Sequence, residues 1–114
     1  MGRRTMCLVA ACFTMSAVLM ITSAPTFADA AAGRKLAQQR CAVCHGIDGL
    51  AKMPIAPHLA GENEVYIQTQ LKAFRTGKRV HEMMSVVAKE LSDDQIADLS
   101  AWYASIKISV TMPP

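Results

Sequence analysis

The chain has 114 residues, a formal net charge of +3 at pH 7 and 52% hydrophobic residues. That length allows one domain. Because Arg3 and Arg4 supply two of the three excess charges, the rest of the chain is close to neutral. A near-neutral domain gives no support for nucleic-acid binding or for attachment to an anionic membrane surface.

Residues 1–28 are predicted to be a cleaved signal peptide. Two arginines precede an apolar stretch over residues 7–21, and small residues at 26–28 provide a cleavage site, although cleavage after Ala30 fits equally well. The apolar stretch is shorter than the roughly 20 residues of a membrane-spanning helix. We therefore expect no stable membrane anchor, with an uncleaved signal anchor as the alternative.

The next segment is predicted to be a helix followed by a long loop. Residues 30–44 are rich in alanine and have two helical faces, although Gly33 inside a helix costs about 1 kcal/mol relative to Ala. Glycines and prolines then interrupt every periodic pattern as far as Gly61. A loop of this length in so small a domain needs an internal surface to lie against.

Two further helices are predicted beyond the loop. Apolar side chains recur at helical spacing over residues 62–76, and Gly77 stands where a helix C-cap is expected. A basic turn and a short polar stretch follow, and then Ser92 and Gln95 form a capping box. The last helix has an apolar face made of Ile96, Leu99, Tyr103 and Ile106.

These elements define one all-α domain over residues 31–108, with residues 109–114 as a loose C-terminal tail. No strand pair or internal repeat is evident in the sequence. Without the signal peptide the chain has about 85 residues and few aromatic side chains, so its core is thin. A large apolar prosthetic group would complete such a core.

The segment Cys41-Ala-Val-Cys44-His45 has the spacing by which haem c is attached. Two thiols three residues apart lie on one side of a helical turn and can form thioethers with the two vinyl groups of one porphyrin. The imidazole that follows lies beneath the iron as the proximal ligand. Zinc sites and dithiol redox centres share the CxxC spacing, but zinc requires a second ligand pair and thioredoxin-like proteins require a βαβ pattern. Neither feature is evident, and no other cysteine follows the signal peptide.

A six-coordinate haem needs a second axial ligand from elsewhere in the chain. The candidates by residue type are Met53, Met83, Met84, Met112, His58 and His81. Methionine is more often a core residue than a ligand, yet Met83 and Met84 lie in a polar stretch between two predicted helices. Adjacent side chains point in different directions, so only one of the pair can face the iron. Both histidines are predicted to be surface residues.

The chain resembles small bacterial class I c-type cytochromes, both soluble mono-haem carriers and single domains of di-haem cytochromes. The resemblance runs from Gly33 to about Ile106, and its marks are the CxxCH segment with Gly46, Pro57-His-Leu-Ala-Gly61, Tyr66, Gln70-Leu71, Phe74, Gly77 and Met84. It implies a cytochrome c fold of three to five short helices around one covalent haem. It also implies that Met84 is the axial ligand, with Met83 as its neighbour, and that the carbonyl of Pro57 accepts a hydrogen bond from His45.

The resemblance further implies that the Gly33 face of the first helix crosses the last helix against Leu99 and Trp102, where glycine admits a bulky neighbour. Five cations, which either flank an exposed haem edge or form a scattered solvated face, are Lys72, Arg75, Lys78, Lys89 and Lys107.

The function expected from these features is single-electron transfer in the periplasm, after export by the Sec route, with redox proteins as partners and no enzyme activity. One alternative is a cytochrome subunit bound to a periplasmic dehydrogenase or reductase. Another is a haem enzyme or gas-binding module in which Met84 does not bind the iron. The sequence determines neither the donor and acceptor, nor the reduction potential, nor the oligomeric state.

Overall fold

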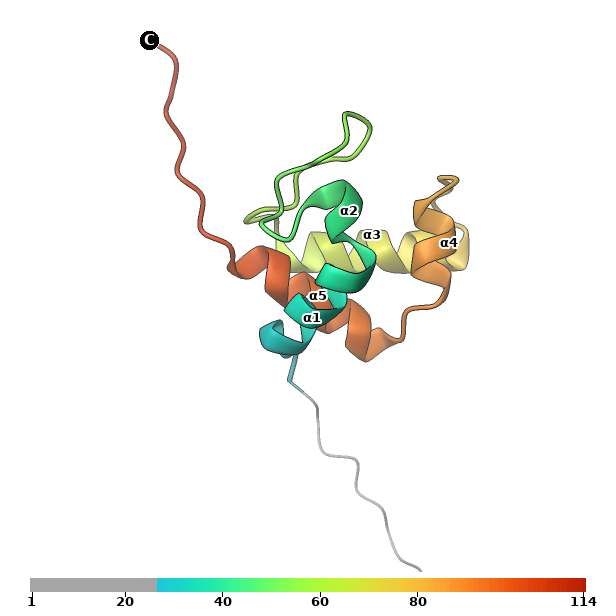
Figure 1. Ribbon diagram of the computed structural model, residues 1–114. Helices are drawn as coiled ribbons and strands as arrows, with labels where there is room; N and C mark the ends of the chain where they lie inside the picture. Colours follow the sequence, from blue (N-terminus) through green and yellow to red (C-terminus); the bar gives the residue numbers. More distant parts are fainter. Residues whose placement is uncertain (1–26) are drawn as a thin grey trace, which may run out of the picture.

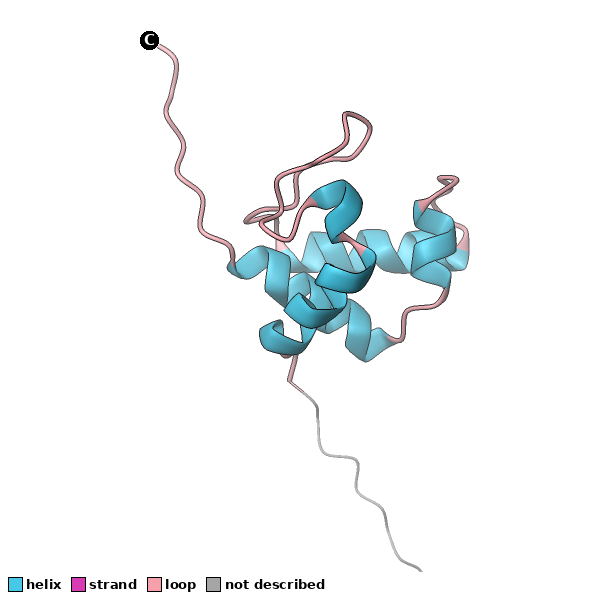
Figure 2. Ribbon diagram, viewed as in Figure 1, coloured by secondary structure: helices cyan, strands magenta, loops and turns pink. Residues whose placement is uncertain are grey.

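The computed structural model describes residues 27–114, and the predicted signal peptide lies almost entirely outside this range. Figures 1 and 2 show that the described part contains helices and loops but no strand. The helices are α1 (Ala30–Arg40), α2 (Ala42–His45), α3 (Glu64–Thr76), α4 (Met84–Lys89) and α5 (Asp93–Ser105). The expected all-α fold class is therefore confirmed. No helix between residues 27 and 114 is long and apolar enough to cross a membrane.

The helix predicted over residues 30–44 is divided at Cys41. Asp29 caps α1 by accepting a hydrogen bond from the Ala31 amide at 2.8 Å, and the helix ends where Cys41 takes φ −116°. A turn at Cys41 then leads into α2, and the amide of His45 donates to the Cys41 carbonyl oxygen at 2.9 Å. The break at Cys41 gives α2 its own direction (Figure 1).

The later helices begin and end close to the predicted residues. Asn63 caps α3, and Gly77 ends it in the left-handed conformation with φ +77°, which favours glycine. At the start of α5, Ser92 and Gln95 exchange both hydrogen bonds of the predicted capping box. The helix α4 was not predicted, because its six residues are too few to display a period.

Packing between α1 and α5 is the most extensive helix contact in the described chain. A Cβ atom on Gly33 would collide with the carbonyl group of Asp98 and lie 3.0 Å from the Leu99 amide nitrogen. The expected crossing against Leu99 is thus confirmed, but the expected reason for the glycine is wrong. The backbone of α5, and not a bulky side chain, occupies the space that a Cβ would need.

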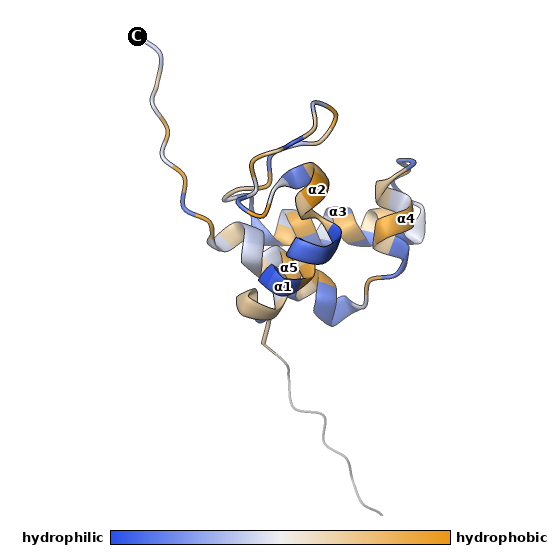
Figure 3. Cartoon of the chain, viewed as in Figure 1, coloured by the Kyte–Doolittle hydropathy of each residue, from blue (hydrophilic) through white to orange (hydrophobic). Residues whose placement is uncertain are grey.

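The hydrophobic core of the described residues is small. It consists of Ala37, Ile67, Leu91, Ile96, Leu99 and Tyr103, with partly buried apolar side chains around it. In Figure 3 the short helices α2 and α4 are largely apolar, whereas much of α1 is hydrophilic. Residues 106–114 leave α5 as a mostly exposed segment without regular structure (Figure 2).

Candidate functional site

A cavity of about 320 Å³ is formed by residues of α2, the 55–62 region, α3, α4 and α5. Sites for small molecules and cofactors occupy roughly 300–1,000 Å³, so the volume suits an organic group. The cavity is lined predominantly by apolar side chains, among them Leu59, Leu71 and Leu99. It also brings together residues that are distant in the sequence, including Cys41, His45 and Met84.

Both cysteines of the CxxCH segment line this cavity as free thiols. Cys41 lies at the break between α1 and α2, and Cys44 lies within α2. Burial raises the pKa of the Cys41 thiol to about 11. Because the thiolate is the reactive form of a cysteine, Cys41 is a poor nucleophile in the folded chain at neutral pH.

His45 is 7% exposed, and its Nδ1 lies 2.9 Å from the carbonyl oxygen of Pro57. A carbonyl oxygen only accepts hydrogen bonds, so Nδ1 carries a proton, and in the neutral ring Nε2 keeps its lone pair. This bond also fixes the orientation of the ring. The imidazole therefore offers a free nitrogen lone pair at a residue that lines the cavity.

Four of the six candidates for a second axial ligand line the cavity: Met83, Met84, His58 and His81. Met53 is not part of the lining, and its Sδ lies 3.4 Å from the Cys44 Sγ. Met112 lies in the exposed C-terminal segment. The cavity therefore reduces the choice to two methionines and two histidines.

The two methionines differ in burial. Met84 is half-buried as the first residue of α4, whereas Met83 is 55% exposed. The sequence places this pair in a polar stretch between two predicted helices, and the structure shows that the short helix α4 begins at Met84 within that stretch. The greater burial of Met84 favours it as the side chain that faces a bound group.

Both histidine side chains are exposed and use Nδ1 for the backbone. His58 accepts a hydrogen bond from the Ala51 amide at 2.8 Å. His81 accepts from the amides of Met83 and Met84 at 3.3 Å and 3.4 Å. These contacts give both histidines a structural role, and His81 holds the beginning of α4.

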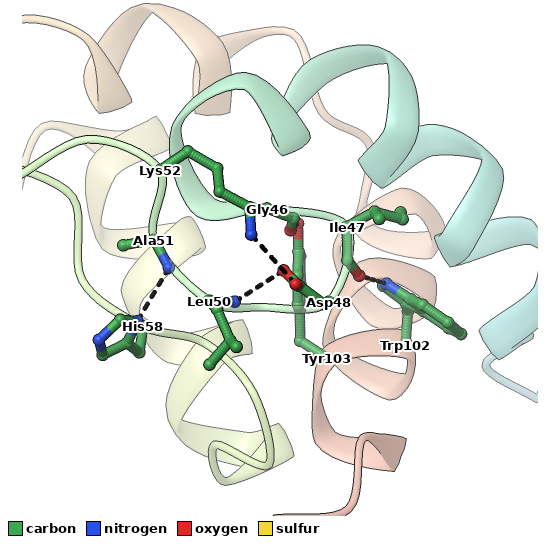
Figure 4. A network of polar contacts seen from close by, with 9 residues as sticks. All are labelled: Gly46, Ile47, Asp48, Leu50, Ala51, Lys52, His58, Trp102 and Tyr103. Carbon is green, nitrogen blue, oxygen red and sulfur yellow. Dashed lines mark hydrogen bonds and ion pairs between the residues drawn. The ribbon is translucent and has the colours of Figure 1, made fainter.

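The beginning of the loop that follows His45 is attached to α5 by two side-chain hydrogen bonds (Figure 4). Trp102 Nε1 donates to the Ile47 carbonyl oxygen, and the Tyr103 hydroxyl donates to the Gly46 carbonyl oxygen, each at 3.1 Å. Burial raises the pKa of Tyr103, so its hydroxyl remains a donor throughout the neutral range. This attachment fixes the loop at its junction with α2, directly after His45.

The same loop is stabilised within itself by Asp48 (Figure 4). Its carboxylate accepts from the Leu50 amide at 3.0 Å and forms an ion pair with Lys52 at 3.1 Å. The Leu50 hydrogen bond, followed by that with Lys52, holds the pKa of Asp48 below its usual value. The loop thus has its own polar network although it has no regular secondary structure.

None of the five cations singled out in the sequence lines the cavity. Arg75, for example, donates to the Leu91 carbonyl oxygen and pairs with Asp93, which connects α3 to the start of α5. The charged side chains that do line the cavity, apart from its histidines, are Arg79 and Glu62. Sequence reasoning missed both, because a basic turn and a helix-start glutamate are ordinary surface features.

Comparison with known proteins gives a consistent result. The profile of the cytochrome c family matches residues 30–107. Cytochrome c-554(548) of Halomonas halodenitrificans is 41% identical over 80 residues, which cover 68% of this chain and 95% of that protein. Cytochrome c4 of Pseudomonas aeruginosa is 43% identical over 84 residues, which cover 74% of this chain and 41% of that protein.

A similar solved structure is that of cytochrome c4 from Acidithiobacillus ferrooxidans, with a TM-score of 0.66 and 34% identity. The match covers 74% of this chain and 53% of that one. The chain therefore spans about half the length of the cytochrome c4 relatives, while it spans nearly all of the shorter cytochrome c-554(548).

Proposed function

Because the chain belongs to the cytochrome c family, whose cofactor is covalent haem c, we propose that it is an exported single-electron carrier. In this proposal Cys41 and Cys44 hold the haem as thioethers, and His45 and Met84 are the axial ligands of its iron. The bound group supplies the reversible exchange of one electron between ferric and ferrous iron.

The observation that supports this proposal most is the composition of the cavity. Two thiols and an imidazole from the α1–α2 region line the same apolar space as a half-buried thioether from α4. His45 is already oriented by Pro57 through the 2.9 Å hydrogen bond. The donor set and the apolar walls therefore fit haem c.

The two proposed iron ligands, His45 and Met84, explain why we expect electron transfer and not the binding of a substrate. If His45 and Met84 both held the iron, no position would remain open for oxygen or a substrate, and the methionine would raise the potential. The residues of this chain then have three tasks: to hold the group, to exclude water from its faces and to keep the ligands in place. A carrier needs no additional catalytic residue, and this is why we propose that the chain is not itself an enzyme.

The proposal extends to the cellular setting. Export by the Sec route to the periplasm agrees with the predicted signal peptide at residues 1–28. Thioether formation before folding also agrees with the raised pKa of Cys41, whose thiol is poorly reactive once it is buried. The partners are redox proteins that exchange electrons at the edge of the haem.

The experiment that tests this function is a redox titration of the mature holoprotein followed by visible spectroscopy. We expect one reversible one-electron transition, a low-spin spectrum in both states, a ferric methionine–iron charge-transfer band, and no change on addition of CO. A ferric spectrum without that band, together with binding of CO to the ferrous protein, would contradict the carrier and support a haem enzyme or gas-binding module.

A further inference from the structure

The start of α1 is joined to α5 by a contact of the main chain. The amide nitrogen of Asp29 donates a hydrogen bond to Asp98 Oδ1 at 2.7 Å, although the two residues are 69 positions apart. Asp98 is half-buried at the α1–α5 crossing, where its own carbonyl group faces Gly33. Its carboxylate forms no ion pair with any described residue. A neutral N–H group therefore holds this carboxylate, and a charged donor at the same place would hold it more strongly.

The hollow around this contact concentrates negative charge. It lies between the start of α1 and α5, and the aspartates Asp29, Asp94 and Asp98 are part of its lining. Among the described residues that line it, none is basic. Like charges at short range repel one another, so a cation placed among these carboxylates would stabilise the contact between the two helices.

The two described residues that precede Asp29 contribute little to the fold. The Phe27 side chain is 91% exposed, and Ala28 is exposed as well. Neither residue forms a hydrogen bond with another described residue. A chain that begins directly after Ala28 therefore keeps every packed contact of α1.

Asp29, in contrast, satisfies the first amides of α1. Its carboxylate accepts from the Ala31 amide at 2.8 Å, and its carbonyl oxygen accepts from the Gly33 amide at 2.9 Å. Such caps replace the partners that the first N–H groups of a helix lack. Cleavage after Ala30 would remove both acceptors together with the contact to Asp98. The structure thus distinguishes between the two cleavage positions that fit the sequence equally well.

We propose that a signal peptidase hydrolyses the Ala28–Asp29 peptide bond and that the new amino group of Asp29 forms an ion pair with Asp98. Hydrolysis consumes one water, leaves a carboxylate on Ala28 and leaves on Asp29 an amino group that is protonated at neutral pH. The nitrogen already lies at hydrogen-bond distance from Asp98, and a charged donor makes such a bond roughly twice as strong. Processing thereby supplies the cation among the three carboxylates and fastens α1 to α5. This inference rests on the proposed export of the chain.

The cleavage position is tested by the intact mass of the holoprotein isolated from the periplasm after expression of the full 114-residue chain. We expect the mass of a chain that begins with Asp29 and carries one haem. A chain that begins with Ala31, or with any other residue, would overturn the assignment. Retention of residues 1–28 would overturn the proposed export as well, whereas the carrier function is decided separately by the visible spectrum.

The ion pair is tested by the thermal midpoint of the holoprotein and of Asp98→Asn between pH 7 and about 10. Asparagine keeps an acceptor oxygen but has no charge. An α-amino group loses its proton near pH ~8, whereas the carboxylates that face it, those of Asp29, Asp94 and Asp98, stay ionised over this range. An ion pair of this kind stabilises the fold below that pH and is lost as the pH rises. We expect the midpoint of the parent to fall with pH, and that of Asp98→Asn to be lower at pH 7 and to fall less.

A holoprotein exported with another signal peptide, so that it begins with Phe27, is the matched control. It keeps the amide hydrogen bond from Asp29 to Asp98 but moves the charged amino group to an exposed residue. Its midpoint should fall less with pH than that of the parent, and Asp98→Asn should lower it less. If Asp98→Asn yields no holoprotein, the parent is compared with this longer chain alone. Equal pH profiles in the parent and in the variant used would overturn the ion pair.

Discussion

The α1–α5 crossing and the cavity between α2 and α4 belong to one small domain but differ in packing. The crossing is closely packed, whereas the cavity is a space with apolar walls. At the crossing the backbones meet at Gly33, and Ala37, Ile96 and Leu99 are almost fully buried. Around the cavity large apolar side chains stay exposed, such as Ile55 at 69% and Tyr66 at 51%. The atoms of the chain alone fill the crossing, whereas the cavity is the place that our proposal assigns to the haem.

Of the changes considered, removal of the haem is expected to have the largest effect on the stability of the fold. Replacing both Cys41 and Cys44 by Ser abolishes covalent attachment, and the small core of the described residues is too little to sustain the fold. We expect a chain without haem that is largely unfolded, measured as loss of helical signal in far-UV circular dichroism. A cooperative thermal transition in the apo-chain would show that the crossing alone supports the domain.

The next largest effect is expected at the crossing itself, for Gly33→Ala in the holoprotein. The new methyl group collides with the carbonyl of Asp98, and overpacking of this kind costs about 3 kcal/mol. Gly77→Ala is the matched control, because its methyl group meets no atom within 4 Å and only the left-handed backbone is strained, at about 1 kcal/mol. Denaturant unfolding measures both, and equal losses would refute the steric account of Gly33.

A moderate effect is expected where the crossing helix meets the loop of the cavity. Tyr103→Phe removes the hydroxyl that donates to the Gly46 carbonyl oxygen, which then keeps only the hydrogen bond from the Gly49 amide. Loss of one such hydrogen bond costs about 1 kcal/mol of unfolding free energy. Tyr66→Phe serves as the control, because the Tyr66 hydroxyl is not hydrogen-bonded to any described residue. A Tyr103→Phe protein as stable as Tyr66→Phe would mean that the loop is held by other contacts.

The smallest effect concerns acid stability at the start of α5. The hydrogen bond from Arg75, followed by its charge, holds the pKa of Asp93 below the usual 3.8. A lowered folded pKa gives stability that is present above the unfolded value and is lost as the pH falls through the folded value. Asp93→Asn should therefore unfold with a flatter pH dependence below 3.8 than the parent.

Because Asp93 is exposed, the difference should be small. Glu82→Gln is the control, since Glu82 is exposed and forms no ion pair in the described chain. If Asp93→Asn retains the acid response of the parent, the ion pair with Arg75 does not contribute to folding.

Local signals in the sequence predicted most of the helical structure. The capping box of Ser92 and Gln95 and the left-handed Gly77 depend on a few neighbouring residues, and both occur as predicted. The break at Cys41 and the helix α4 were missed, because tertiary contacts and short length leave no local pattern. The reason for Gly33 was wrong because sequence does not reveal how closely two backbones approach.

The residues of the candidate site also differ in whether the sequence alone predicts them. Cys41, Cys44 and His45 form a contiguous motif that can be read directly from the sequence, and Met84 and Pro57 were reached through a family resemblance. Arg79 and Gln70 carry no motif, and their contact joins residues nine positions apart across the end of α3. Groups brought together only by the fold are recognised from the structure alone.

The central claim, that Met84 is the second ligand of the iron, is tested most directly by the ferric spectra of Met84→Ala and Met83→Ala. The two residues are adjacent and both line the cavity, so each serves as the control for the other. Our account predicts that Met84→Ala becomes high-spin, loses the methionine–iron band and binds CO when reduced, while Met83→Ala keeps the parent spectrum. An unchanged spectrum in Met84→Ala would contradict it.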